Sequence, residues 1–151
     1  MHIKVFNNLC EKSMNKTKIT IESIINAEVS KVWNYFTDPK HITKWNFASD
    51  DWHCPDAVND LRIGGKLNYR MEAKDGSFGF DFEAIYDEVI THKILSYTLL
   101  DGRQAKTSFE VFSGLTKVIT TFEAEQQNSV DLQRNGWQAI LNNFKKYVES
   151  N

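Results

Sequence analysis

Histidine, cysteine and paired carboxylates are the reactive residue types in this sequence, and several of them gather in the polar stretch 47–61. His53 and Cys54 are adjacent there, whereas His41 and His92 lie far from them along the chain. Zinc sites use ligands at spacings that let four side chains converge, and adjacent ligands start such a site poorly. We therefore predict no metal site and no cofactor.

The same stretch offers no clear catalytic pair. Cys54 would be a nucleophile only with a base and an electropositive setting, and adjacency to His53 supplies neither. Asp50 and Asp51 are successive carboxylates whose side chains point apart, which suits a solvated loop better than acid–base catalysis. Gly64-Gly65 lacks the spacing and the helix of a nucleotide-binding loop, so we interpret it as the turn into a strand. No residue is assigned a catalytic role, and we expect a binding protein rather than an enzyme.

Composition limits the class of protein further. A chain of 151 residues is one domain by default, and an aromatic content of 13% predicts a core built from large rings. The net charge is −2 and Lys and Arg form no long block, which argues against nucleic-acid binding and a polybasic membrane surface. No stretch has the apolar length of a membrane span. The two cysteines, Cys10 and Cys54, indicate free thiols in a reducing cytoplasm.

The first residues differ from the rest of the chain. Residues 1–13 lack the apolar core of a secretory signal, and patterned sequence begins only after Met14. We expect either that Met14 is the natural start or that residues 1–16 form a loosely attached tail. A single domain is predicted over 17–151.

The hydrophobic pattern predicts the elements that position these side chains. Residues 18–27 alternate and are rich in β-branched types, which indicates a strand. Ser30 is the predicted N-cap of a short helix that ends at Pro39, and a second short helix is predicted over 39–45. The stretch 47–61 shows no period. We interpret it as a long ordered loop that could act as a lid.

Alternating apolar residues then predict a meander of strands. An Asp75-Gly76 turn between the first two strands of this meander brings the apolar residues to one face and a charge pair to the other. The predicted pairs are Met71–Phe80, Tyr69–Phe82 and, on the outer face, Arg70–Asp81.

The register of the next two hairpins is also predicted from the requirement that their apolar residues share one face of the sheet. A three-residue loop over 101–103, with a bulge at Gly102, keeps the inner face apolar and sets Leu95 opposite Phe109. A Ser113-Gly114 turn closes the last hairpin. The inward residues of the shared strand are Ala105, Thr107, Phe109 and Val111, and the predicted pairs are Phe109–Val118 and Ala105–Phe122.

From Ser129 the chain has the pattern of one amphipathic helix. Its apolar stripe is Trp137, Ile140, Leu141, Phe144 and Val148. Gly136 costs this helix about 1 kcal/mol relative to alanine, which we attribute to close packing, with room for a ligand as the alternative. Strands flanked by helices predict an α+β fold. In this fold a curved antiparallel sheet of about six or seven strands wraps on the long C-terminal helix, with two short helices after the first strand.

Three segments of the chain resemble a known family. They are 32–45 (Val-Trp-Asn-Tyr-Phe-Thr-Asp-Pro-Lys-His-Ile-Thr-Lys-Trp), 60–66 (Asp-Leu-Arg-Ile-Gly-Gly-Lys) and Gly136-Trp137. In this order they are similar to the START-like, or SRPBCC, superfamily. More closely, they resemble the branch named after the C-terminal domain of the activator of the ninety-kilodalton heat-shock chaperone's ATPase. The resemblance implies the helix-grip fold. It does not imply one function, because lipid carriers, hormone receptors, cyclases and co-chaperones share this scaffold.

The space between the sheet and the last helix is either a packed core or a ligand cavity. Tyr69 and Tyr97 are inward phenols that need partners if buried, and Met71 would add an adaptable wall. We predict a non-enzymatic domain that binds a small hydrophobic or amphipathic ligand in a cavity of more than about 300 Å³. For each single ring, core packing is the alternative. The predicted ligand-binding residues are Trp45, Trp52, Tyr69, Met71, Phe80, Phe82, Tyr97, Phe109, Trp137, Leu141 and Phe144.

Two other classes of function stay open. The resemblance implies a co-chaperone-like module that contacts a heat-shock chaperone in the stress response. A cyclase- or hydrolase-like enzyme on hydrophobic substrates would use His53, Asp51 or a tyrosine as acid or base. The sequence predicts no nucleic-acid partner and no membrane insertion, and it leaves monomer and dimer open.

Overall fold

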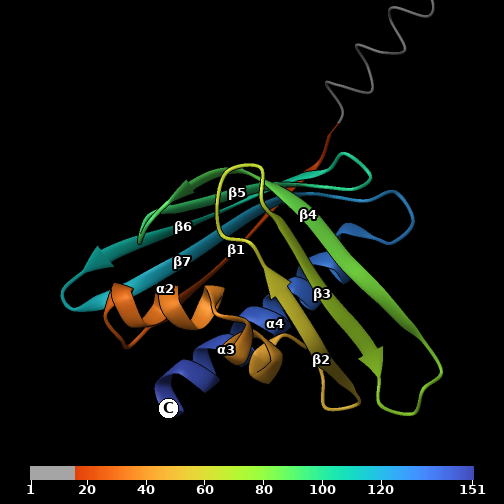
Figure 1. Cartoon of the computed structure of the whole chain (residues 1–151), viewed down its shortest axis with the longest axis horizontal. Coiled ribbons are helices and arrows are strands. Elements are labelled where there is room, and N and C mark those ends of the chain that lie inside the picture. The colour runs from red at the N-terminus through yellow and green to blue at the C-terminus, as the bar shows by residue number, and fades with distance from the viewer. Residues whose placement is uncertain (1–15) are drawn as a thin grey trace, which may run out of the picture.

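A computed structural model describes residues 16–151 and shows one antiparallel sheet gripping a long helix (Figure 1). The strands are β1 Lys18–Ile25, β2 Trp52–Asn59, β3 Lys66–Ala73, β4 Gly79–Ile90, β5 Ile94–Leu99, β6 Gln104–Phe112 and β7 Leu115–Glu123. The helices are α2 Val29–Thr37, α3 Pro39–Trp45 and α4 Val130–Ser150. The expected tail and the expected start at Met14 lie outside the described residues.

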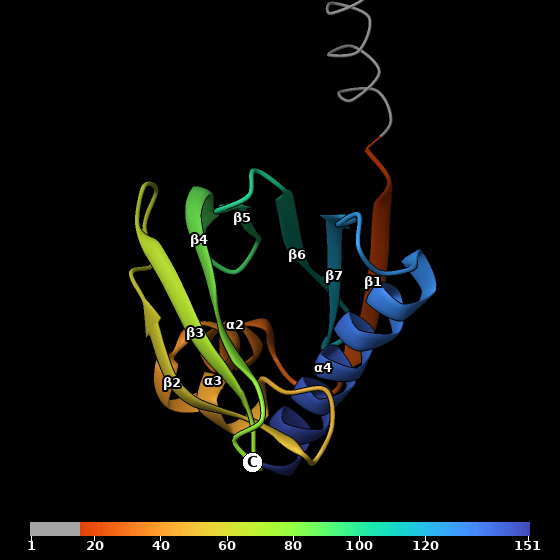
Figure 2. The same ribbon diagram turned by 90° about the vertical axis from the view of Figure 1, so that its right-hand side faces the viewer.

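The seven strands form a single sheet in the order β1-β7-β6-β5-β4-β3-β2. Figure 2 shows the sheet curled into a trough, with β2 and β3 on one side and β7 and β1 on the other. α4 packs along β1, and α3 packs on β2 at the other edge. Register shifts in β2 and β4 bend the sheet. The predicted α+β helix-grip fold is confirmed.

The helix boundaries confirm two predicted helix starts and correct one predicted cap. Ser129 caps α4, since its Oγ accepts a hydrogen bond from the Leu132 amide at 3.1 Å. Pro39 opens α3 as predicted, with Asp38 as the cap. The prediction for Ser30 was wrong, because α2 begins one residue earlier, at Val29, and its N-cap Glu28 makes no side-chain cap. Val29 packs against the core, and this contact extends the helix to a residue before the predicted cap, Ser30.

The stretch 47–61 was wrongly predicted to be a loop throughout, because it contains the edge strand β2. Pro55 lies where the pairing with β3 shifts register, between His53 and Asp56. Proline is tolerated at the edge of a sheet and at a bulge, where no ladder hydrogen bond is needed from its nitrogen. The many polar side chains of β2 reflect the same exposed position at the edge of the sheet.

The pairs predicted for two hairpins are confirmed. Tyr69 lies opposite Phe82 in the β3–β4 pair, and Phe109 lies opposite Val118 in the β6–β7 pair. Ser113 and Gly114 both have positive φ, as a two-residue turn of this hand requires. The β3–β4 connection is longer than predicted. It closes with a hydrogen bond from the Ala73 amide to the Phe78 carbonyl, 2.9 Å.

The register predicted for the β5–β6 hairpin was wrong by two residues. Leu95 lies opposite Thr107, not Phe109, and the Leu99 amide bonds the Arg103 carbonyl at 2.8 Å. Three-residue loops place their left-handed residue last, so Gly102, with φ of 91°, ends the loop and Arg103 pairs with Leu99 just before β6. A shift of two keeps every side chain on its predicted face.

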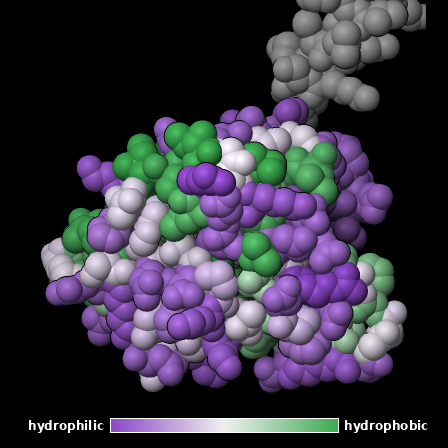
Figure 3. All heavy atoms as spheres, viewed as in Figure 1, coloured by the Kyte–Doolittle hydropathy of each residue, from purple (hydrophilic) through white to green (hydrophobic). Residues whose placement is uncertain are grey.

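The core lies between the inner sheet face and the buried stripe of α4. Leu141, Phe144 and Val148 are buried, while Trp137 and Ile140 are partly covered. Val111 was wrongly placed inward, because it lies near the end of β6 and is 62% exposed. On the face shown in Figure 3 hydrophilic residues dominate, with separate hydrophobic groups between them.

Candidate functional site

A cavity of about 190 Å³ lies between the inner face of the sheet and α4. Eight of the predicted ligand-binding residues form part of its wall. They are Trp45, Tyr69, Met71, Phe80, Phe82, Tyr97, Trp137 and Leu141. They come from five different elements, since β3, β4 and β5 supply the floor and α4 the roof, with Trp45 added by α3.

The other three predicted residues lie elsewhere. Phe144 packs against Phe36 and Trp45, with ring centroids 5.2 and 4.7 Å away. Phe109 packs edge-on against Trp33 at 5.2 Å. Both rings fasten α2 and α3 to the rest of the core, so they are packing residues by position.

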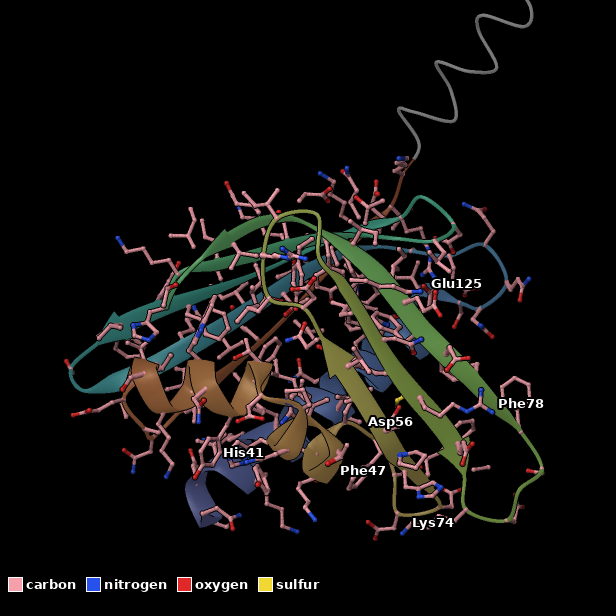
Figure 4. The ribbon with its side chains drawn as sticks, in the orientation of Figure 1. His41, Phe47, Asp56, Lys74, Phe78 and Glu125 are labelled. Atoms are coloured by element: carbon pink, nitrogen blue, oxygen red, sulfur yellow. The ribbon has the colours of Figure 1, made fainter. Side chains whose placement is uncertain are left out.

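Trp52, the third, lies in an exposed aromatic cluster near the tip of the β3–β4 hairpin. Its ring centroid is 6.0 Å from that of Phe78 and 6.1 Å from that of Phe80. Figure 4 places Phe78 at the outer side of β4, beside this tip. Phe80 is 42% exposed and also lines the cavity, so the cluster lies at the cavity rim.

Several wall residues were absent from the predicted set. They are Ile21, Phe36, Asn46, Leu67, Tyr86, Leu95, Thr107, Thr120 and Ile140. Strand alternation already pointed Leu67, Tyr86, Leu95 and Thr107 inward, and that signal was sufficient to find them. Asn46 carries no such signal, because it is the residue that ends α3.

The prediction of a cavity larger than about 300 Å³ was wrong. The cavity volume of about 190 Å³ lies below the predicted minimum of about 300 Å³ for drug-sized ligands. An engineered apolar cavity of about 150 Å³ is large enough to bind benzene. The space therefore suits a single small ring or short chain and not a whole lipid.

Trp137 is the wall residue of α4 that contacts rings on two strands. Its indole stacks on Phe122 of β7, with centroids 3.8 Å apart, and meets Phe82 of β4 edge-on at 6.0 Å. Trp137 therefore joins the two sides of the trough across the cavity. The Trp45 indole at the α3 side is fixed by a hydrogen bond that its Nε1 donates to the Tyr35 carbonyl, 2.9 Å.

Three of the hydroxyl groups on the wall, those of Tyr86, Thr107 and Thr120, already have partners. The Tyr86 hydroxyl donates to Asn59 Oδ1 at 2.7 Å, and Asn59 Nδ2 donates to the Thr37 carbonyl at 2.7 Å. Burial is the main cause that raises the pKa of Tyr86 to about 12. The Thr107 and Thr120 hydroxyls bond each other at 2.7 Å.

Asn46 and Tyr97 are different. Tyr97 is 9% exposed, and its hydroxyl makes no hydrogen bond within the described part of the chain. Asn46 is 8% exposed, and its Nδ2 reaches only sulfur atoms, Met71 Sδ at 3.6 Å and Cys54 Sγ at 4.0 Å. No fully enclosed polar side-chain atom of residues 16–151 lacks a partner, so the unpartnered groups of Tyr97 and Asn46 each keep some contact with open space.

The wall carries no side chain of Asp, Glu, Lys, Arg or His. The nearby charges lie on the outer face of the sheet. There Arg70 Nε contacts Glu72 Oε2 at 2.9 Å, and Arg70 Nη1 contacts Asp81 Oδ2 at 3.4 Å. The cavity is therefore an uncharged, mostly apolar space with a few polar tips.

Comparison with known proteins identifies the family. The model of the family described as Activator of Hsp90 ATPase homolog 1-like protein matches residues 26–149. The chain belongs to this AHSA1-like family. Curated proteins give no match.

Two solved structures are similar to this AHSA1-like protein in sequence and fold. An AHSA1-like protein from Aeromonas hydrophila is 43% identical with a TM-score of 0.84, covering 89% of this chain and 93% of its own. A protein from Cytophaga hutchinsonii is 46% identical with a TM-score of 0.78, covering 88% of this chain and 92% of its own. A third, from Nitrosomonas europaea, shares the fold at 19% identity and a TM-score of 0.76, covering 88% of this chain and 94% of its own.

The Gly64-Gly65 segment of this AHSA1-like protein is a turn, as predicted. Gly64 has φ of 80°, and its amide donates to the Tyr86 carbonyl at 2.8 Å. Gly65 is buried against the backbone, where a Cβ would collide with the Asp60 carbonyl oxygen. The two glycines therefore lead the chain tightly into β3 beside β4.

The reactive residues of this AHSA1-like protein do not converge on the cavity. Burial raises the pKa of the Cys54 thiol to about 11, which opposes thiolate formation near neutral pH. His53 Nε2 lies 3.6 Å from Glu72 Oε1 on a partly exposed surface. His41 Nδ1 bonds the Tyr147 hydroxyl at 2.8 Å, near α3 in Figure 4.

Two negative findings apply to residues 16–151 of this AHSA1-like protein. No three side chains of His, Cys, Asp or Glu gather there closely enough to hold a metal ion. None of the helices in this range has the length and apolar character needed to span a membrane.

Proposed function

We propose that this AHSA1-like protein is a non-enzymatic binding domain that holds a small, mainly apolar molecule between the sheet and α4. The observation that carries the proposal is the cavity itself, walled by aromatic and aliphatic side chains at the centre of the domain. Unfilled apolar space is costly. A ligand that fills such space gains contacts with wall atoms that have no partner in the empty cavity.

The size of the space sets the size of the ligand. By comparison with a benzene-binding cavity of about 150 Å³, we infer a ligand of one ring or a short chain. Phe82, Tyr69 and Trp137 offer ring faces and edges to such a molecule. Trp45, Met71, Phe80, Tyr97 and Leu141 complete the proposed contacts from the predicted set.

Binding is tested with toluene as the probe and amide chemical shifts as the readout. We expect saturable shifts confined to residues around the cavity. In Ile140→Phe, which adds bulk to the cavity wall, the shifts should disappear. Leu132→Phe is the matched control on the exposed side of α4 and should leave them unchanged.

Native mass spectrometry of the freshly purified protein gives an independent test. We expect a bound small molecule that Ile140→Phe loses and Leu132→Phe retains. Absence of any bound mass, together with no toluene response at the cavity, would contradict the proposal.

A second candidate is a module that contacts a heat-shock chaperone, as the family description suggests. The exposed aromatic cluster of Trp52, Phe78 and Phe80 supplies a surface with which a protein partner could pack. A role in a cytoplasmic stress response would follow from this candidate. The test is the ATPase rate of the chaperone from the same host. Stimulation at stoichiometric amounts, lost in Phe78→Ser, would favour this function.

A further inference from the structure

The polar atoms of the cavity wall fall into two classes that differ in their partners. Tyr86 and Tyr97 lie opposite each other on β4 and β5, with ring centroids 6.1 Å apart. The Tyr86 hydroxyl donates to Asn59, and the Tyr69 hydroxyl lies within hydrogen-bonding reach of Tyr86, whereas the Tyr97 hydroxyl makes no hydrogen bond within residues 16–151. A hydroxyl on an apolar wall that has no protein partner can bond a ligand, so Tyr97 is the phenol left available.

Asn46 is a second wall residue whose polar atoms lack a strong hydrogen-bond partner. Its amide nitrogen meets only thioether and thiol sulfur, which are weak acceptors, and its carbonyl oxygen has no partner in the described residues. At the end of α3 the side chain is held against Met71 of β3 and is more than nine-tenths buried. Asn46 therefore offers both a donor and an acceptor to the cavity.

An aromatic floor separates the two free groups. Met71, which contacts Asn46, shares a strand face with Tyr69, and the Tyr69 ring stacks on Phe82 at 6.2 Å. Phe82 in turn meets Tyr97 edge-on at 6.3 Å. A flat or short apolar body lying on this floor would bring its ends toward Asn46 and Tyr97.

The absence of ionisable carboxylate, ammonium, guanidinium and imidazole groups from this wall excludes charged ligands. A carboxylate or an ammonium group would lose its hydration and gain no counter-ion. A neutral amide, carbonyl or hydroxyl group needs only the hydrogen bonds that Asn46 and Tyr97 can supply.

We infer that the cavity selects uncharged small molecules with an apolar, ring-sized body and a terminal amide, carbonyl or hydroxyl group, which Asn46 and Tyr97 recognise. This inference rests on the proposed function, since it names the ligand class of that site.

The test compares three probes of similar size by amide chemical-shift titration: benzamide, toluene and benzoate. We expect benzamide to bind more tightly than toluene, and benzoate to bind at least about tenfold more weakly than benzamide. Tyr97→Phe and Asn46→Leu keep the size of the side chain and remove its hydrogen-bonding groups. Each should weaken benzamide by about fivefold and leave toluene unchanged.

Tyr35→Phe is the control, because it removes a phenol on α2 that does not line the cavity. It should leave the affinities for all three probes unchanged.

The outcomes separate the inference from the proposed function. If toluene binds as well as benzamide, or benzoate binds equally well, the inference is overturned and the cavity remains a binding site. If benzamide is unaffected by one of the two variants, the role of that residue is overturned. If no probe shifts the cavity amides, both the inference and the proposed function fail.

Discussion

Tyr86 and Tyr97 share a sheet face and a buried setting, but only Tyr86 belongs to a hydrogen-bonded chain. That chain joins β4, β2 and α2 through Asn59, which donates onward to the Thr37 carbonyl. At the residue scale the structure thus distinguishes a phenol that stabilises the fold from one that does not. Residue type and alternation are the same for the two, so the sequence alone cannot make this distinction.

Removal of these two hydroxyls should have opposite consequences for stability. Tyr86→Phe leaves the Asn59 carbonyl oxygen without its donor, and we expect a loss of about 1–3 kcal/mol in the free energy of unfolding. Tyr97→Phe removes a group that has no partner, and we expect no loss. Urea denaturation of both variants measures the difference. Equal destabilisation by the two substitutions would show that Tyr97 has a structural partner.

Buried thiol and phenol groups make stability depend on alkaline pH. Burial raises the pKa of Cys54 to about 11 and, as the main cause, raises the pKa of Tyr69 and of Tyr97. In the unfolded chain these groups ionise at their ordinary values, about 8.5 for cysteine and 10 for tyrosine. Above those values the unfolded state binds fewer protons than the folded state, so stability falls as pH rises.

We therefore expect the free energy of unfolding to decline from about pH 8.5 and more steeply above about pH 10. Each group contributes a slope of about 1.4 kcal/mol per pH unit until its folded-state pKa is reached. Urea denaturation at pH 7–10.5 measures the profile. Cys54→Ala should flatten the part between pH 8.5 and 10, and an equally steep profile in that variant would rule out Cys54 as the cause.

At the element scale, the sequence predicted most helices and strand pairs, and its errors share a physical origin. β2 was missed because its edge position allows Pro55 and polar side chains, both of which weaken the alternating pattern. The β5–β6 register was missed because loop geometry, not side-chain pattern, decides whether Gly102 lies second or third in the loop. Hydrophobic periodicity specifies which face of the sheet a side chain occupies. It constrains edge strands and the position of a glycine within a loop less strongly.

Gly136 and Gly65 are two glycines whose replacement should have opposite effects on their elements. A Cβ at Gly136 would meet no atom within 4 Å, so close packing does not explain this glycine. We expect Gly136→Ala to stabilise α4 by about 0.5–1 kcal/mol. Gly65→Ala should destabilise the turn into β3, because its Cβ would meet the Asp60 carbonyl oxygen and that atom is backbone. Thermal unfolding of both variants checks the signs, and a lower midpoint for Gly136→Ala would contradict this account.

At the scale of the whole molecule, one sheet serves two purposes along its length. Around Phe109 and Phe144 the space inside the sheet is filled, because both rings pack against Phe36. Toward Phe82 and Trp137 the inner face of the sheet leaves the cavity. The predicted site included residues of both regions, because periodicity identifies inward side chains and cannot show where facing elements diverge.

This division predicts different phenotypes for the two aromatic residues of the α4 stripe. Phe144 is fully buried, and Phe144→Ala should cost about 3–5 kcal/mol of stability through the cavity it creates. Trp137 is partly covered and lines an existing cavity, so Trp137→Ala should cost less stability. The Trp137→Ala substitution should, however, weaken toluene binding by about fivefold or more, since an aromatic ring that contacts the probe is lost.

The comparison of Phe144 and Trp137 requires both measurements on each variant. Urea denaturation gives the free energies of unfolding, and toluene titration under conditions where each variant is folded gives the affinities. Binding that survives in folded Trp137→Ala but fails in folded Phe144→Ala would place the binding space beside α2 and α3. Greater destabilisation by Trp137→Ala would mean that the stacked pair with Phe122 is the main contact between α4 and the sheet. The expected order, with Phe144 dominating stability and Trp137 dominating binding, follows from the position of each ring on α4 relative to the cavity.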